Sequence, residues 1–431
     1  MRKTLLAGAG VLALSAGMAS AASHMNLDGQ QLTVFGPWLG PDQEVVEQVL
    51  GAFAEQTGAD VRYVGSDSFE QPIMGDAEAG SAPNVAVFPQ PGLAADMARR
   101  GFLTPLADGT GDWVRDNYAA GQSWVDLGTY AGADGADHLY GFFYKVDVKS
   151  LVWYSPENFE DAGYEVPTTM EELKALTDQI VADGGTPWCI GLGSGGATGW
   201  PATDWVEELL LRTQTPDVYD GWVTNEIPFN DPRIVAAIDE FGYFARNDAY
   251  VAGGAGAVAS TDFRASPKGL FSSPPQCYMH RQASFIPAFF PEGTVVGEDA
   301  DFFYFPPFEA NADLGRPVLG SGGLVSPFND RAVTTAFIDF LQTPIAHEIM
   351  MAQGQFLTPH KDANLDIYTS DTQRQLGEIL TTATSFRFDG SDLMPGEIGT
   401  NAFWTGMVDY TTGTDATTVA NAIQERWDSI Q

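Results

Sequence analysis

The chain is poor in cysteine, histidine and basic residues, with two, five and 21 of them among 431 residues. The histidines are scattered and form no H-E-x-x-H motif, so a metal centre is not indicated. Beyond its first 21 residues the chain has no apolar run long enough to cross a membrane. With 57 acidic residues the net charge is −36, a field that repels nucleic acids and anionic membranes. The composition favours a neutral ligand and no nucleic-acid partner.

Sequence signatures of enzymes are also missing. No G-x-S-x-G motif occurs near a plausible strand-to-helix turn, and chance pairs of carboxylates abound in so acidic a chain. The run Gly191–Gly196 matches G-x-G-x-x-G, but Glu207 and Glu208 follow too early for a dinucleotide fingerprint. A second glycine-rich loop, Gly320–Pro327, lacks the lysine of a phosphate-binding loop. We therefore expect no catalytic residues, no metal and no cofactor.

The first residues are typical of a secretory signal peptide. Arg2 and Lys3 give a positive start, and the short apolar run Leu5–Ala19 leads into an A-x-A cleavage signature. We expect residues 1–21 to be removed on export to the periplasm.

The two cysteines, Cys189 and Cys277, form an even pair, and an oxidising compartment favours a disulfide between them. Two separate buried thiols are the alternative. A bridge closing so long a loop would stabilise the fold by about 4–5 kcal/mol in the chain-entropy model.

The 410 residues that remain are too many for one ordinary core and favour two domains. Strands are predicted at Gln31–Trp38, Ala59–Gly65 and Asn84–Gly92, with a helix that begins at Pro41 between the first two. This βαβαβ order predicts a mostly parallel sheet in an α/β fold. Ligands bind at the carboxyl ends of such strands, which makes four residues candidates: Trp38, Asp67, Phe69 and Gln90.

Later segments have clear helix and strand signals. Leu139–Ser155 is rich in β-formers, and a helix should follow a capping box made by Thr168 with Glu171 or Thr169 with Glu172. Apolar residues spaced by four near the end of the chain, Val419, Ile423 and Trp427, predict a C-terminal amphipathic helix.

Three further groups of side chains are candidates for a binding site. Trp200 with Asp204 offers an indole face and a hydroxyl acceptor, or alternatively a buried indole and a helix-start acid. His280 and Gln282 should share one face of a strand, directed either at a cleft or at solvent. The glycines Gly322 and Gly323 either bring backbone donors to a ligand or form a tight turn.

The stretch Asp389–Tyr410 combines carboxylates with aromatic and apolar bulk. Asp389 and Asp392 can accept hydroxyl protons, and Trp404 can cover the C–H face of a sugar ring. An ordinary loop and helix with a packed indole is the alternative. The chemistry points to carbohydrate binding.

Several long segments resemble the α-glucoside-binding subset of the family-1 extracellular solute-binding proteins, the capture subunits of ABC sugar importers. They are Ala202–Pro232, Thr261–Glu292, Thr343–Asn364 and Thr384–Tyr410. The resemblance implies an α/β, two-lobe periplasmic binding protein fold with discontinuous lobes joined by a hinge. It places residues 22–147 plus about 286–344 in one lobe, and 148–285 plus about 345–431 in the other.

The resemblance also implies a receptor that closes its lobes around a trehalose-, sucrose- or maltose-like α-glucoside and delivers it to an ABC permease. A receptor for another polyol or an anionic sugar, or a secreted carbohydrate-active enzyme, is the alternative. Arg387 bears on that choice, because it could pair with Asp389 or Asp392 or bind an anionic sugar. A monomer is the default expectation.

Overall fold

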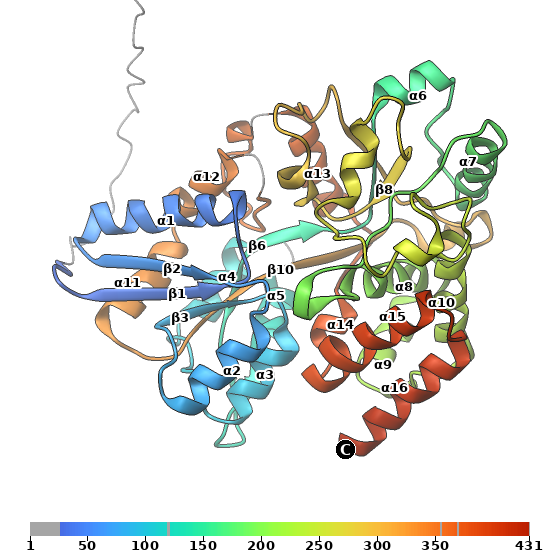
Figure 1. Ribbon diagram of the computed structural model, residues 1–431. Coiled ribbons are helices and arrows are strands. Elements are labelled where there is room, and N and C mark those ends of the chain that lie inside the picture. Colours follow the sequence, from blue (N-terminus) through green and yellow to red (C-terminus); the bar gives the residue numbers. More distant parts are fainter. Residues whose placement is uncertain (1–25, 119–120, 354–355, 369, 431) are drawn as a thin grey trace, which may run out of the picture.

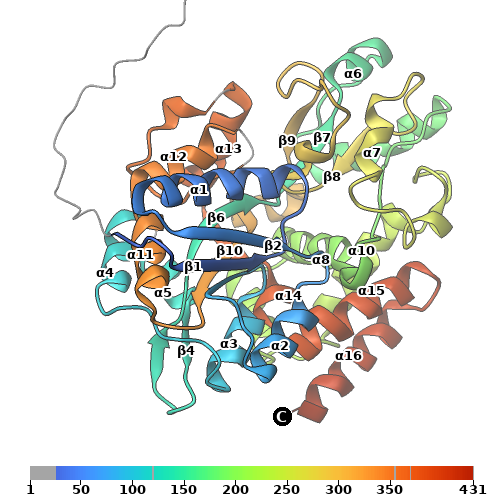
Figure 2. The ribbon, with the colours of Figure 1, turned by 60° about the vertical axis from the view of Figure 1, so that its left-hand side comes forward.

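The computed structural model describes residues 26–118, 121–353, 356–368 and 370–430; the expected signal segment lies outside these residues. Two groups of elements stand side by side in Figure 1, and Figure 2 shows the same division after a 60° turn. We call the group around the six-stranded sheet the first lobe and the group around the three-stranded sheet the second lobe. Within the described residues, no helix combines the length and apolarity needed to cross a membrane.

The first lobe is built on a mixed sheet whose first three strands run parallel, as predicted from the βαβαβ pattern. The order is β11-β10-β3-β1-β2, and β6 pairs with the other edge of β10. The strands are β1 (Gln31–Gly36), β2 (Asp60–Gly65), β3 (Val85–Phe88), β6 (Phe142–Val148), β10 (Pro317–Pro327) and β11 (Ser385–Phe388). β10 runs antiparallel to both β3 and β6 and parallel to β11.

The second lobe contains a smaller antiparallel sheet of order β8-β7-β9. Its strands are β7 (Leu151–Tyr154), β8 (Met279–Arg281) and β9 (Asp301–Tyr304). Lys149 and Ser150 alone separate β6 from β7, so the predicted β-rich run passes directly from one lobe into the other. A two-stranded hairpin, β4 (Thr129–Ala131) with β5 (Asp137–Leu139), extends from the first lobe.

Helices cover both sheets, with α1 on one side of the first sheet and α2 and α3 on the other (Figure 1). The helices of the first half are α1 (Pro41–Thr57), α2 (Glu70–Ala79), α3 (Pro91–Arg99), α4 (Thr110–Asn117), α5 (Gly121–Leu127), α6 (Pro156–Ala162), α7 (Met170–Ala182) and α8 (Trp200–Thr213). The others are α9 (Pro216–Val223), α10 (Pro232–Ala245), α11 (Ala332–Leu341), α12 (Pro344–Met351), α13 (Asp371–Thr382), α14 (Gly390–Leu393), α15 (Trp404–Thr411) and α16 (Ala416–Ile430).

Two of the predicted helix signals are confirmed in detail. The Thr169 hydroxyl caps α7 by accepting from the backbone N–H of Glu172, whose carboxylate accepts from Thr168. These reciprocal bonds satisfy donors that a helix start otherwise leaves unpaired. The C-terminal helix α16 buries Val419, Ile423 and Trp427 on one face, as their spacing predicted.

The buried apolar residues divide into three clusters that follow the two lobes. One cluster fills the first lobe between its sheet and α1, α3 and α11, and another fills the second lobe around α8, α10, α15 and α16. The third lies between β7 and α13 and includes both cysteines. Each lobe therefore has its own core, and the chain passes between them three times, at β6–β7, between β9 and β10, and between β11 and α14.

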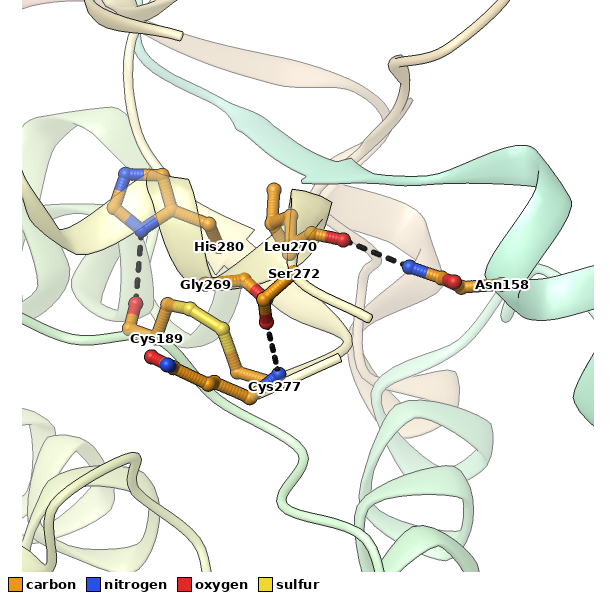
Figure 3. The surroundings of a disulfide bond; sticks show 8 residues. Asn158, Cys189, Gly269, Leu270, Ser272, Cys277 and His280 are labelled. Atoms are coloured by element: carbon orange, nitrogen blue, oxygen red, sulfur yellow. Dashed lines mark hydrogen bonds between the residues drawn. A yellow bond between two sulfur atoms is a disulfide. The ribbon is translucent and has the colours of Figure 1, made fainter. Parts of the chain in front are cut away.

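Cys189 and Cys277 form a disulfide, which confirms the predicted pairing; their Cα atoms lie 5.5 Å apart. Figure 3 shows the bridge packed against Gly269, with His280 nearby. A Cβ at Gly269 would approach both sulfur atoms to within 2.8 Å, so the bridge fits closely only against glycine. The disulfide thereby fastens the segment before α8 to the segment that leads into β8.

Candidate functional site

A cavity of about 1060 Å³, including the part open to solvent, lies between the lobes. The first lobe contributes the residues that follow the carboxyl ends of β1, β2 and β3, as the sheet geometry predicted. They are Trp38, Asp67, Phe69, Glu70 and Gln90, with Asp42 of α1. The second lobe contributes Trp200, Phe263, Arg264, Phe285 and Phe289. The crossing segments and the C-terminal part add Lys145, Asp147, Lys149, Ser321, Gly322, Gly323, Asp389, Asp392 and Trp404.

Three tryptophans from different parts of the chain line this cavity. Trp38 follows β1, Trp200 begins α8 and Trp404 begins α15. The Trp200 ring is held edge-on by Phe263, with 5.0 Å between ring centroids. Indole faces from both lobes are suited to the C–H patches of a pyranose.

The indole of Trp38 needs a glycine beside it. A Cβ at Gly323 would lie 3.0 Å from Cζ2 of Trp38 and 2.8 Å from Cγ1 of Val87, closer than side chains normally pack. The glycine-rich part of β10 thus makes room for the indole at the cavity wall.

Several buried polar atoms of the cavity have no hydrogen-bond partner. Within the described residues these include Oε1 of Gln90, Nε1 of Trp404 and Oδ1 of Asp42. All three side chains are less than 10% exposed. Burying a polar group without a partner costs about 1–3 kcal/mol, so each of these atoms is poised to gain a bond from a hydroxyl of a ligand.

Three carboxyl groups of the cavity have raised pKa values. Burial raises the pKa of Asp42 and of Glu70 above their usual range, and Glu70 accepts a hydrogen bond from Gln90 Nε2 at 2.8 Å. Burial and the charge of Asp389 raise the pKa of Asp392 well above its usual range. These three carboxyl groups can therefore be neutral donors as well as acceptors toward hydroxyls.

Lys145 presents a buried ammonium among aromatic rings at the cavity. Its Nζ lies 4.2 Å from the ring centroid of Phe356 and 5.6 Å from that of Trp38. Its carboxylate partner is Asp147, at 3.4 Å. The alternation that points both side chains of β6 to one face of the strand also brings them to the cavity.

Behind the cavity lies a fully buried network of charges centred on α8. Asp204 pairs with Lys149 at 2.8 Å and with Arg281 at 3.4 Å. Glu208 pairs with Arg281 at 3.2 Å and also with Arg212. Every member is at most 4% exposed, so the opposite charges of this network compensate one another away from water.

Nine of the thirteen residues predicted to bind ligand line the cavity. They are Trp38, Asp67, Phe69, Gln90, Trp200, Gly322, Gly323, Asp392 and Trp404. The structure brings these together from segments that are far apart in the sequence. Their contact with a ligand stays a prediction.

The other four lie outside the cavity wall. Asp204 belongs to the buried network, and His280 hydrogen-bonds the carbonyl of Cys189 through Nδ1 at 2.8 Å. The strand β8 ends at Arg281, so Gln282 leaves the predicted alternation, and its Oε1 accepts from the next backbone N–H at 2.8 Å. Each of these three side chains therefore has an internal hydrogen-bond or ion-pair partner, although Nε2 of His280 has none.

Arg387 makes neither of the pairings considered from the sequence. Its guanidinium forms a two-pronged pair with the exposed carboxylate of Asp220, at 2.6 Å and 2.9 Å. Asp389 instead pairs with Lys149. Asp220 is on α9, so the side chain of Arg387 is directed to that helix, and Arg387 does not line the cavity.

Sequence reasoning missed the cationic residues of the cavity, Lys145, Lys149 and Arg264. A signal was present for two of them. Lys145 and Asp147 alternate in the otherwise apolar strand β6, and Lys149 continues the same spacing one residue beyond its end. Charges at every second position of a buried strand mark one face as polar. Arg264 stands in an irregular segment and has no comparable signal.

The elements and the cavity define a two-lobe α/β protein with a polar–aromatic site between its lobes. The model of the bacterial extracellular solute-binding protein family matches residues 38–346, and the chain belongs to this family. It is 64% identical over 406 residues to the alpha-glucosides-binding periplasmic protein AglE of Rhizobium meliloti (strain 1021), covering 94% of this chain and 89% of AglE. It is 44% identical over 401 residues to the osmoprotective compounds-binding protein GgtB of Synechocystis sp., covering 93% of each.

Solved structures share the fold at low sequence identity. The bacterial solute receptor AcbH, described as having a preference for β-D-galactopyranose, matches with a TM-score of 0.79 at 19% identity, over 93% of this chain and 99% of that one. Maltose-bound MalE3 of T. maritima matches with a TM-score of 0.72 at 14% identity, over 94% and 100%. The expected two-lobe solute-binding fold is therefore confirmed, and the family is one of receptors and not of enzymes.

Proposed function

We propose that this protein captures an α-glucoside of the trehalose, sucrose or maltose type in the interlobe cavity and delivers it to an ABC permease. The observation that carries the proposal is a single cavity lined both by indole rings and by buried polar atoms that have no hydrogen-bond partner. A disaccharide has C–H faces for the indoles and hydroxyls for the polar atoms. The identity of 64% to AglE, a protein named for binding α-glucosides, supports the same ligand class.

A neutral ligand fits the charges better than an anionic sugar. Six carboxyl groups line the cavity against three cations, and Lys145 and Lys149 each have a carboxylate partner already. Arg281 and Arg387, the residues whose presence would favour an anion, are engaged by other carboxylates. An anionic sugar would have to compete with these carboxylates for the same cationic side chains.

Several properties of the mature receptor are part of the proposal. We infer cleavage after residue 21, release into the periplasm and action as a monomer. The lobes would follow the predicted division with three exceptions. β9, paired with β7, would move with the second lobe, whereas α12, packed on α1, and β11, paired with β10, would move with the first. Closure of the lobes would bury the ligand, and ligand would favour the closed state only by its higher affinity for that state.

Replacing Trp200 by alanine should weaken disaccharide binding at least tenfold, or about 1.4 kcal/mol. The change removes one of the three indole faces of the cavity, and Trp200 is only half-buried, so the melting temperature of the ligand-free protein should change little. The measurement is calorimetric titration of both proteins with the same sugar.

Trp113→Ala is the matched control, because Trp113 is also half-buried and lies in the first lobe away from the cavity wall. It should leave the affinity unchanged. Equal losses of sugar affinity in the two variants, or wild-type affinity in Trp200→Ala, would contradict sugar binding in this cavity.

A further inference from the structure

Lys149 is the buried lysine of the two-residue link between β6 and β7, where the chain passes from the first lobe to the second. Its Nζ lies 2.8 Å from Oδ1 of Asp204 and also contacts Oδ2 of Asp389. The side chain is 5% exposed and its two partners are at most 2% exposed. Such a lysine between two carboxylates holds them in place by charge and by hydrogen bonds together.

The three residues belong to three different segments. Asp204 is on the first turns of α8, and Asp389 stands between β11 and α14. Asp389 also caps α14, since its Oδ1 accepts from the backbone N–H of Asp392 at 3.1 Å. The backbone of Lys149 donates to the carbonyl of Leu319 on β10 at 2.8 Å. One side chain thus joins the interlobe link to a helix of the second lobe and to the turn after β11.

The junction formed by Lys149, Asp204 and Asp389 extends to the cavity. Lys149 and Asp389 both line the cavity, and Nζ of Lys149 lies 5.3 Å from the ring centroid of Trp200. The same ammonium therefore sets the position of one carboxylate and one indole of the candidate sugar site.

The surrounding groups determine the charge of Asp389. Burial would raise its pKa, but Lys149 and the hydrogen bonds around it lower the pKa to about 2. The titratable groups that face the junction from neighbouring elements are Asp204 and Glu207 of α8, Asp392 of α14, Tyr219 of α9 and Arg281 of β8. Among them Arg281 is already paired with Glu208, so Lys149 is the cation that compensates Asp389.

We propose that Lys149 is a positioning residue of the sugar site, which holds the carboxylate of Asp389 at the cavity while it fastens the interlobe link to α8. This inference rests on the proposed function. It assigns to a residue of the crossing segment a part in ligand affinity. The ligand acceptor it maintains is the carboxylate of Asp389.

Lys149→Met, which keeps the length of the side chain and removes its charge, should lower the affinity for the disaccharide at least about tenfold. It should also make binding depend on pH. Without Lys149, burial raises the pKa of Asp389, so the ionised acceptor is lost as the pH falls from about 8 to about 5. The wild-type affinity should decline less over the same range, because the pKa of Asp389 is about 2 and, of the two partners of Lys149, Asp204 is the one that titrates there, with a pKa of about 7. Titration calorimetry across that range measures both effects.

Two further variants separate positioning from folding. Lys149→Arg retains the charge and should restore at least part of the affinity and the weaker pH dependence. The double variant Lys149→Met/Asp389→Asn removes both charges and leaves Asp204 with Arg281, at 3.4 Å, so it should fold even if the single variant does not. It should bind weakly without the new pH dependence. Lys174→Met is the control, because Lys174 pairs with Glu240 outside the cavity wall.

Wild-type affinity in Lys149→Met, with an unchanged pH profile, would overturn the inference, as would wild-type affinity in the double variant. Failure of the wild-type protein to bind any disaccharide is a different result, since it would contradict the proposed function before the variants are compared.

Discussion

Replacing Cys189 and Cys277 together by alanine should lower the free energy of unfolding by about 4–5 kcal/mol. The disulfide closes a loop of 88 residues, and in the chain-entropy model so long a loop confines the unfolded chain strongly. Both cysteines are at most 3% exposed, so alanine introduces no buried polar group. Denaturant unfolding of the oxidised wild-type protein and the double variant measures the difference.

Reduced wild-type protein is the matched control, because it loses the covalent bond and keeps the side-chain volume. It should unfold at a denaturant concentration close to that of the double variant. A stability loss below about 1 kcal/mol in both samples would mean that this loop is already constrained in the unfolded chain. Sugar affinity should change much less than stability, since neither cysteine lines the cavity.

Asp204→Ala should destabilise the ligand-free protein by about 3–5 kcal/mol, the usual effect of removing one partner of a buried ion pair. Asp204 is fully buried and is shared by Lys149 and Arg281. Burial raises its pKa to about 7, with Lys149 opposing the shift, so the wild-type protein loses stability as Asp204 ionises with rising pH, and the two proteins must be compared at one fixed pH. Thermal or denaturant unfolding without sugar is the appropriate measurement.

Asp67→Ala is the companion variant. Asp67 lines the cavity but is exposed, so its removal should weaken sugar binding and leave the stability within about 0.5 kcal/mol. If Asp204→Ala instead behaved like Asp67→Ala, with full stability and reduced affinity, Asp204 would be a ligand contact and not a structural charge.

The parts of the fold that could be predicted are those with local signals. The β-forming runs of β1 and β2, the apolar stripe of α1 and the capping box of Thr169 each depend on residues within a few positions of one another. The pairing of β10 with both β3 and β6 has no such signal, because it joins segments far apart in the chain.

The candidate site shows the same limit. Trp38 and Gln90 could be placed at the cavity because strand ends converge in a parallel sheet. Asp204 is indistinguishable from a cavity residue in the sequence, since its role depends on Lys149 of the β6–β7 link and Arg281 of β8, which are distant in the chain. Whether a carboxylate meets a ligand or an internal cation is decided by tertiary contacts that the residue type does not encode.

The central claim is that the interlobe cavity captures an α-glucoside and releases it unchanged. Calorimetric titration of the purified mature protein with trehalose, sucrose, maltose and glucose, followed by analysis of the sugars, tests this directly. The account predicts saturable one-to-one binding of at least one of the disaccharides and recovery of that sugar intact. Absence of binding to all of them, or cleavage of the glycosidic bond, would contradict it.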